Sequence, residues 1–320
     1  MTEQKSSYDA ESIKVLEGLE AVRKNFNIIE LSKKIKKKGD VLILSKELRI
    51  KPRILSLIKE EGRILSHFPG IHKSKSNALS RLRTDRELRK FSQLYDVYGT
   101  SARKLYKLVK IWNQKIQGNP LMFITRKEHD IIIGSLLGDA SIRQRDKNSC
   151  FRVSHSIKQE DYIKWILNIL NNFIISEFEY RKRIIANHEV NMINLATRTH
   201  SVFNFYRKLF YKNGRKVINN EILNQITPRS LAIWICDDGS YSKKQGYIIL
   251  CTNSYSLEEH KLIKEFFNKK FGLNPTIGFR DGKYYYLRFK KDDTKKIIET
   301  IKPFIPKCML YKIGELNHGY

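Results

Sequence analysis

Two acidic residues, Asp139 and Asp238, stand at equivalent points of an internal repeat. Each one ends an apolar run and is followed by a small residue and a serine, in the segments Ile131–Ser141 and Ser230–Ser240. The aspartates are 99 residues apart, so the repeating unit is half a domain and not a short solenoid repeat. Two carboxylates supplied by a duplicated unit could together hold a divalent cation.

The position of these acids at helix ends supports that chemistry. The C-terminus of a helix carries a partial negative charge, so an aspartate there is unfavourable. If the two apolar helices pack in parallel, Asp139 and Asp238 become neighbours and repel one another unless a cation lies beside them. A hard divalent ion such as Mg²⁺, or Mn²⁺ in its place, suits oxygen ligands. Hydrolysis of a phosphodiester by a metal-activated water is the reaction that such a site would support.

The apolar runs carry small residues at a spacing that favours helix pairing. Gly134 and Gly138 lie four residues apart, as do Ala232 and Cys236 in the second run. Glycine inside a helix costs about 1 kcal/mol relative to alanine, so two glycines in one helix need a structural reason. We predict that these four residues form the interface between the two helices.

The composition indicates a polyanionic partner. The 320 residues include 61 Lys and Arg against 33 Asp and Glu, a formal net charge of +28. Such an excess repels itself in the folded state, and nucleic acid is the leading partner, with a ribosomal-type basic protein as the alternative. Four cysteines without a C-x-x-C pair predict neither a zinc site nor a disulfide framework, which fits a reducing cytoplasm. No apolar run is long enough for a membrane span, and the polar N-terminus is not typical of a signal peptide.

Residues 25–120 read as a basic, mainly helical region. Apolar residues recur at helical spacing from Leu42 to Ile58, and Pro52 would begin the second helix of a helix-turn-helix. A second candidate runs from Leu94 to Lys110, with its turn at Gly99–Ser101. Plain helical hairpins with basic surfaces explain both patterns equally well.

From residue 121 the pattern alternates between helices and β-hairpins, which predicts an α+β fold. The expected strands lie in segments bounded by Phe151–Ile157, Arg181–Thr197, Tyr247–Thr252 and Thr276–Lys290. Asn187-His188 and Asp281-Gly282 are the expected hairpin turns, the latter of a favoured two-residue type. The expected helices are Gln159–Phe173, Ser201–Lys212, Leu257–Phe271 and Thr294–Ile301.

At the two repeated segments the chain resembles the LAGLIDADG homing endonucleases in their single-chain, two-motif form. The second motif, Leu231–Ser240 (LAIWICDDGS), is the more specific, and Gly134–Ala140 (GSLLGDA) is similar to the first. The resemblance implies two pseudo-symmetric αββαββα halves, residues 125–222 and 226–316, that form a DNA-binding saddle. It also implies that Asp139 and Asp238 bind the catalytic metal, and that Asp237 faces elsewhere.

The family further implies a basic residue near the end of each half. Lys216, 77 residues after Asp139, and Lys312, 74 residues after Asp238, match those positions. Such lysines could polarise the attacking water or stabilise the charge of the transition state. Asn219 replaces a proline that is usual in this family, so Arg215 is the alternative to Lys216.

The hairpins would then form two sheets that lie along the major groove of DNA. Outward positions of the predicted strands should contact bases or phosphates. The candidates are Arg143, Arg145, Arg152, Arg198, Lys244, Arg280 and Arg288.

Residues 1–24 form a separate segment. The stretch Tyr8–Lys24 resembles the first residues of the B subunit of DNA gyrase, and the likeness stops at Asn25. Gyrase activity is not implied, because the ATP-binding motifs lie beyond that point. The resemblance implies a leader derived from an upstream exon, with the reading frame inside an intron of a gyrase gene.

The sequence therefore predicts an intron-encoded, Mg²⁺-dependent endonuclease that acts as a monomer on double-stranded DNA. If the host is bacterial, the expected location is the cytoplasm, in association with the nucleoid. An intron RNA maturase with reduced or no cleavage is one alternative, with intron RNA as its partner. A DNA-binding protein without catalysis is another, although it would not explain two acids at helix ends. An intein is disfavoured, because no splice-junction residues are found at either end.

Overall fold

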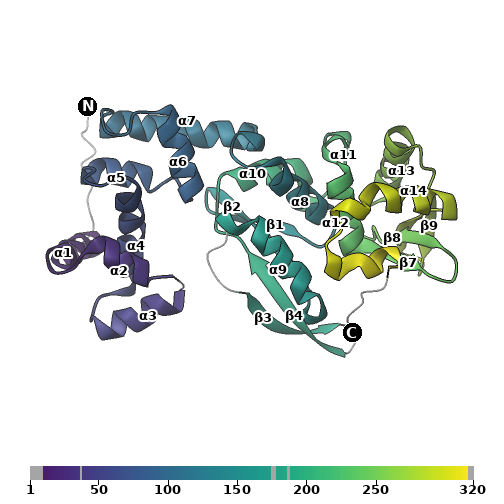
Figure 1. The fold of residues 1–320 in the computed structure, drawn as a ribbon, viewed down its shortest axis with the longest axis horizontal. Coiled ribbons are helices and arrows are strands. Elements are labelled where there is room, and N and C mark those ends of the chain that lie inside the picture. Colours follow the sequence, from purple (N-terminus) through teal and green to yellow (C-terminus); the bar gives the residue numbers. More distant parts are fainter. Residues whose placement is uncertain (1–9, 37, 174–177, 186–187, 316–320) are drawn as a thin grey trace. The chain divides into compact units, whose positions relative to one another are not determined.

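The computed structural model of the chain describes residues 10–36, 38–173, 178–185 and 188–315 (Figure 1). By its internal contacts the chain divides into two compact units, and the division falls between Trp112 and Asn113.

The first unit is helical. Its helices are α1 (Ala10–Asn25), α2 (Ile28–Lys34), α3 (Lys38–Glu47), α4 (Pro52–His67), α5 (Lys73–Leu79), α6 (Asp85–Leu94) and α7 (Ala102–Gly118), which continues into the second unit. Helices α1, α2 and α4 contribute aliphatic side chains to a common core, among them Val22, Leu31 and Ile58. A buried carboxylate, Glu87, accepts a hydrogen bond from Trp112 Nε1 at 2.9 Å, which ties α6 to α7.

Both segments that suggested a helix-turn-helix fold as consecutive helices. A short turn joins α3 to α4, and Pro52 is the first residue of α4, where its missing amide hydrogen has no cost. Residues 95–101 join α6 to α7. The helix-turn-helix interpretation of either pair stays a prediction.

The second unit contains two αββαββα repeats, which confirms the α+β fold. The first repeat consists of α8 (Arg126–Leu137), β1 (Ser141–Arg145), β2 (Asn148–Ser156), α9 (Glu160–Ile169), β3 (Glu179–Ile185), β4 (His188–Ala196) and α10 (Val202–Phe210). The second consists of α12 (Pro228–Asp238), β7 (Gly239–Ser242), β8 (Tyr247–Leu250), α13 (Leu257–Phe271), β9 (Thr276–Arg280), β10 (Tyr284–Arg288) and α14 (Lys291–Ile301).

Each repeat builds one antiparallel sheet, and the two sheets have the same strand order. The orders are β1-β2-β4-β3 and β7-β8-β10-β9. Helices cover one face of each sheet, and the core lies between them; in the first repeat it includes Phe151, Val153 and Leu195. Phe173 and Phe203 pack edge to face within this core, with ring centroids 5.1 Å apart and an interplanar angle of 61°, one of the arrangements that aromatic pairs favour.

Short elements connect the repeats and complete the second one. Strands β5 (Tyr211–Lys212) and β6 (Arg215–Lys216) form a small hairpin, which α11 (Asn220–Gln225) follows. The 3₁₀ segment η5 (Lys307–Ile313) follows α14 and a shorter 3₁₀ turn. These two segments carry the basic residues Lys216 and Lys312.

The predicted strands and helices of the second unit agree with the structure to within a few residues. In the β9–β10 hairpin, Asp281 and Gly282 both have positive φ, 56° and 62°, and the Lys283 amide donates to the Arg280 carbonyl oxygen at 3.1 Å, so the chain turns tightly at these residues. The register pairs Arg280 with Tyr284, so the loop has three residues and not the predicted two. The first predicted turn is at residues 187–188; Asn187 lies outside the described residues, and β4 begins at His188. Strands β1 and β7 were not predicted, because their mostly polar sequences lack a clear alternation.

Candidate active site at the helix seam

Helices α8 and α12 lie side by side, and their first turns are fixed by matching caps (Figure 1). The Thr125 side chain accepts a hydrogen bond from the Glu128 amide at 3.2 Å, and Glu128 accepts one from the Thr125 amide at 2.8 Å. Thr227 and Ser230 form the same reciprocal cap on α12. Such capping boxes satisfy amide hydrogens that the helix itself leaves free, so both helices begin at fixed residues.

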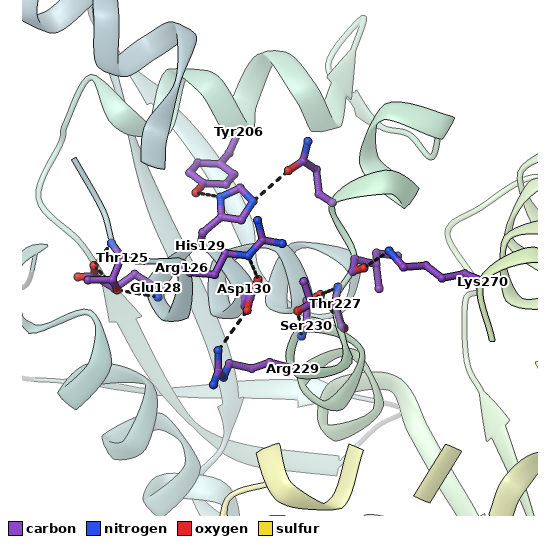
Figure 2. A network of polar contacts seen from close by, with 12 residues as sticks. Thr125, Arg126, Glu128, His129, Asp130, Tyr206, Thr227, Arg229, Ser230 and Lys270 are labelled. Carbon is purple, nitrogen blue, oxygen red and sulfur yellow. Dashed lines mark hydrogen bonds and ion pairs between the residues drawn. The ribbon is translucent and has the colours of Figure 1, made fainter. Parts of the chain in front are cut away.

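A polar network joins the beginnings of the two helices (Figure 2). Asp130 of α8 is buried and forms ion pairs with Arg126 at 3.0 Å and with Arg229 of α12 at 3.2 Å. His129, also buried, bonds the Tyr206 hydroxyl at 2.7 Å and the Gln225 side chain at 3.2 Å. Burial lowers the pKa of His129, so the neutral imidazole is favoured in this network. The network holds α8, α10, α11 and α12 in register.

The two glycines of the first motif lie where α12 comes closest. A Cβ atom added at Gly134 would lie 2.4 Å from the Ser230 carbonyl oxygen and 2.6 Å from Ile233 Cβ. A Cβ atom added at Gly138 would lie 2.5 Å from Asp237 Cβ. Neither position has room for a side chain, so both glycines lie where α8 contacts α12.

The partner residues on α12 differ from the predicted ones. Ala232 and Cys236 are fully buried, but the residues that face the glycines are Ile233 and Asp237. When Asp139 is aligned with Asp238, Ile233 and Asp237 become the counterparts of the glycines, one residue later than we predicted. The prediction assumed small side chains on both helices. At the contact between α8 and α12, which we call the seam, glycines on one helix instead face larger side chains on the other.

The catalytic candidates Asp139 and Asp238 lie at the C-terminal ends of these paired helices. The Asp139 side chain is 47% exposed, whereas Asp238 is largely buried. Burial and the nearby Asp139 carboxylate raise the pKa of Asp238 to about 7, although Lys216 and a hydrogen bond from Trp234 Nε1 (3.3 Å) oppose that rise. The two acids therefore influence one another electrostatically, as the predicted parallel packing requires.

Two lysines hold the backbone around these aspartates in matching ways. Lys216 Nζ donates to the carbonyl oxygens of Gly138 at 2.9 Å and Ala140 at 2.8 Å, on either side of Asp139. Lys312 Nζ donates to those of Asp237 at 3.3 Å and Gly239 at 2.9 Å, on either side of Asp238. An ammonium group at a helix C-terminus offsets the partial negative charge of the free carbonyls.

The structure also decides between Lys216 and Arg215. Arg215 points to the second repeat, where its guanidinium pairs with Glu259 at 2.9 Å. Burial lowers the pKa of Lys216, and the nearby acids, Asp238 first among them, oppose that shift. Lys216 is therefore the counterpart of Lys312.

Asp237 lies inside the seam, so the expectation that it faces elsewhere is wrong. Its side chain is fully buried; Oδ1 accepts a hydrogen bond from the Tyr162 hydroxyl at 2.8 Å, and Oδ2 accepts one from the Asp139 amide at 3.3 Å. Burial and the neighbouring Asp139 raise the pKa of Asp237 well above its usual range. It faces the seam because Gly138, its counterpart, leaves space for a carboxyl group there.

Sequence reasoning also missed His155, which lies beside both acids. Its Nδ1 is 3.6 Å from Asp139 Oδ2, and its Nε2 is 3.8 Å from Asp237 Oδ1. The strand pattern contained a signal, because His155 alternates with Phe151 and Val153 on the buried face of β2. A histidine on an otherwise apolar strand face is uncommon, and that is the signal that marks this position.

The arginines predicted to contact DNA on the first sheet share its uncovered face. Strand register places Arg143 and Arg145 on the same face of β1, and Arg152 lies opposite Ser141 on that face. Arg181 and Arg183 of β3 extend this set and are exposed. The sheet therefore presents a basic surface on the side away from its helices.

On the second sheet, Arg280 and Arg288 lie on one face and are exposed. The Arg288 guanidinium lies 5.7 Å from the ring centroid of Tyr247 on the same face. Lys244 is exposed in the turn between β7 and β8. Arg198 is only half exposed and follows β4 on the first sheet, so it lies outside the strands themselves.

The described residues also bear on two expectations from composition. The four cysteines are free. Within the described ranges, every helix is too short or too polar to cross a lipid bilayer.

Comparison with known proteins places the repeats in context. A family model described as the LAGLIDADG DNA endonuclease family matches residues 129–297, just over half of the chain. The chain is 30% identical over 200 residues to "Probable intron-encoded endonuclease 1" of Wickerhamomyces canadensis, an alignment that covers 59% of this chain and 85% of the relative. It is also 30% identical over 192 residues to "Cytochrome b mRNA maturase bI2" of Debaryomyces hansenii, covering 58% of this chain and 72% of that protein.

Among solved structures, the fold is similar to that of "the homing endonuclease I-WcaI bound to its DNA recognition sequence". The TM-score is 0.55 at 24% identity, and the match covers 68% of this chain and 96% of the other. The first unit lies largely outside the residues that the family model matches.

Proposed function

Since the chain belongs to the LAGLIDADG DNA endonuclease family, we propose that it is an intron-encoded, site-specific endonuclease that hydrolyses phosphodiester bonds of double-stranded DNA. The observation that carries this proposal is the pair of carboxylates at neighbouring helix ends, Asp139 and Asp238. At each aspartate, a lysine donates hydrogen bonds to the carbonyl oxygens of the residues before and after it. A DNA-binding protein without catalysis would account for the net charge of +28 but not for this arrangement.

Asp139 and Asp238 are the residues that would hold the catalytic cation. The donor set fits, because two mutually repelling carboxylates, one of them with a pKa raised to about 7, gain from a shared positive charge. A divalent cation bound there supplies positive charge against the negative charge that develops on the phosphodiester. We propose Mg²⁺ as the ion, with Mn²⁺ as a substitute.

Lys216 and Lys312 have two tasks in this proposal. They fix the backbone on both sides of each aspartate, which sets where the carboxylates point. Their ammonium groups also add fixed positive charge beside the reacting phosphates, in a site where water is partly excluded. Positioning and charge together account for two lysines at equivalent places in the two halves.

The uncovered faces of the two sheets would bind the target. Arginines on β1, β2, β3, β9 and β10 are placed to contact phosphates and base edges in the major groove. One chain holds both halves, which supports a monomer acting on a site without strict symmetry. If the host is bacterial, this substrate places the chain at the nucleoid.

We further propose that the target lies in a gyrase gene. The likeness of Tyr8–Lys24 to the gyrase B subunit supports an upstream exon as the source of residues 1–24. An intron-less fragment of that gene, spanning the junction after the codon for Lys24, is therefore the substrate to test first.

The test is cleavage of this fragment by the purified chain with Mg²⁺. Asp139→Asn and Asp238→Asn should each abolish cutting while binding to the fragment persists, because each removes a negative charge and leaves the DNA-binding faces intact. Asp292→Asn, on an exposed residue in the first turn of α14, is the matched control and should cut normally.

Cutting by either active-site variant at the wild-type rate would contradict the assigned roles. If the chain cuts no gyrase fragment but binds unspliced intron RNA in preference to spliced RNA, the maturase alternative holds instead. The relative from Debaryomyces hansenii, named as a maturase, makes this the second function to test.

A further inference from the structure

Three side chains meet beside the seam in a way that the proposed mechanism does not use. Asp139, His155 and Asp237 each offer one ligand atom, and these atoms lie within 4.8 Å of one another. Asp139 and His155 belong to the first half, and Asp237 belongs to the second. Two carboxylates and one imidazole form a donor set of mixed oxygen and nitrogen character.

The surroundings of His155 orient its ring. The side chain is 2% exposed, and Nδ1 lies 3.1 Å from Gln159 Oε1. The Gln159 amide nitrogen donates to the Tyr311 hydroxyl at 2.8 Å, so the amide presents its oxygen to the ring. A carbonyl oxygen only accepts, so Nδ1 carries the proton and the lone pair lies on Nε2.

That lone pair is unused. Among the described residues His155 Nε2 has no hydrogen-bond partner, although it is buried, and Asp237 Oδ1 lies 3.8 Å from it. A buried nitrogen acceptor without a donor loses the hydrogen bond that it would make in water. The atom is therefore free to bind a cation.

Asp237 has a complementary need. The hydrogen bonds that its carboxylate accepts come from neutral groups, the Tyr162 hydroxyl and the Asp139 amide. A fully buried carboxylate requires neutralisation, either by a proton or by a cation. A cation bound between Asp237 and His155 would satisfy both groups at once.

The distances suit one ion. Two ligands that each lie about 2.1 Å from an ion are about 3.0 Å apart at a right angle and about 4.2 Å apart when opposite. The 3.8 Å between His155 Nε2 and Asp237 Oδ1 falls inside this range. Asp139 completes the set, since its ligand atom lies within 4.8 Å of those of the other two residues and its side chain is 47% exposed.

The second half has no equivalent. Ser141 pairs with Arg152, and Ser240 pairs with Ile249, so the counterpart of His155 is Thr252. The Thr252 hydroxyl lies 2.6 Å from His260 Nε2, which occupies that nitrogen. The imidazole-containing cluster is thus a property of one side of the seam.

We propose that Asp139, His155 and Asp237 form a divalent-cation site that selects Mn²⁺, Co²⁺ or a similar transition-metal ion over Mg²⁺ and Ca²⁺. Imidazole favours transition metals, whereas sites built from oxygen alone suit Mg²⁺ and Ca²⁺. The Gln159 side-chain oxygen accepts the hydrogen bond from Nδ1–H, so Gln159 acts as the partner that orients a metal-binding histidine. The site deepens the proposed function, because Asp139 would be shared with the catalytic cation, yet it forms without DNA.

Mn²⁺ added to the full chain without DNA provides the test. Pulsed EPR detects the ¹⁴N coupling of an imidazole bound directly to Mn²⁺, and the wild-type chain should show it. His155→Gln should remove the coupling and weaken Mn²⁺ binding by about tenfold or more in a titration. His260→Gln, the matched control from the second half, should keep both the coupling and the affinity.

A wild-type spectrum without ¹⁴N coupling at saturating Mn²⁺ would overturn the proposal, even if the variant fails to fold. Coupling that persists in a folded His155→Gln protein would overturn it as well. Asp237→Asn should weaken Mn²⁺ binding more than Mg²⁺ binding; equal losses would count against selection.

Cleavage assays separate this proposal from the endonuclease proposal. A chain that cuts DNA with Mg²⁺ but shows no imidazole coupling retains the proposed function and loses this site. A chain that shows the coupling but cuts no DNA retains the site and loses the function.

Discussion

Replacing Gly134 with alanine tests the helix seam on which the active site depends. The new methyl group would lie 2.4 Å from the Ser230 carbonyl oxygen and 2.6 Å from Ile233 Cβ, where ordinary contacts are at least about 3.4 Å. The Ser230 carbonyl oxygen belongs to the backbone of α12, so it can move away only if the whole helix moves. The two helices must therefore separate by up to about 1 Å. Overpacking of this kind costs about 1–3 kcal/mol.

The net effect is smaller, because alanine favours a helix over glycine by about 1 kcal/mol. We therefore expect Gly134→Ala to reduce the free energy of unfolding by up to about 2 kcal/mol. For a domain of about 150–250 residues, each kcal/mol corresponds to about 2–4 °C in Tm. Thermal unfolding followed by circular dichroism should thus show a decrease of a few degrees.

Activity should fall more than stability does. The seam positions Asp139 against Asp238, and displacement of catalytic groups by about 1 Å costs about a hundredfold in rate. Gly118→Ala is the matched control: this glycine ends α7, and a Cβ there would meet nothing within 4 Å. The reasoning is refuted if Gly134→Ala matches the control in both Tm and cleavage rate.

Three further predictions concern charge. Lys216→Met and Lys312→Met should each lower kcat by about a hundredfold or more, because each removes fixed positive charge from the site. DNA affinity should change little. Single-turnover cleavage and gel shift measure the two quantities, and a loss of affinity alone would contradict the prediction. Asp238 has a pKa of about 7 in the folded chain, well above its unfolded value, so the folded state holds its proton more tightly. The metal-free protein should therefore lose free energy of unfolding as pH rises from about 4 to 7. Urea titrations at several pH values should show this dependence, and Asp238→Asn should reduce it. Arg143→Ala or Arg145→Ala should weaken DNA binding. Where the lost contact is to a phosphate, the slope of log K against log salt concentration should also decrease in magnitude by about one. An unchanged affinity would show that the residue lies outside the interface.

The local sequence was sufficient to predict the repeated helices and two of the hairpins, β3–β4 and β9–β10. Thr125 with Glu128 and Thr227 with Ser230 were not among the predicted features, although these caps operate within four residues and fix where α8 and α12 begin. The positive φ angles of Asp281 and Gly282 are likewise set by their own residue types. Such signals are local, and a single sequence reveals them.

Local patterns did not predict which side chains of α12 face α8, because that depends on packing across the seam. Ala232 and Cys236 have the small side chains expected of an interface, yet Ile233 and Asp237 occupy it. Only the rotation of α12 against α8 decides which side chains face the glycines, and that rotation depends on packing in both repeats. A register error of one residue turns a helix by about 100°, which moves a side chain to another face.

The sequence by itself determined the duplicated motif and the two aspartates, because each is defined by residue type and spacing; the two lysines were expected from the resemblance to the family. The tertiary structure alone decided that Lys216 and not Arg215 reaches the helix end, that Asp237 is buried in the seam, and that His155 joins it. The contacts of Lys216 and Asp237 connect residues 75 or more positions apart, and their energies depend on burial and on neighbouring charge. No local pattern encodes burial of that kind, so it emerges only when the two halves pack together.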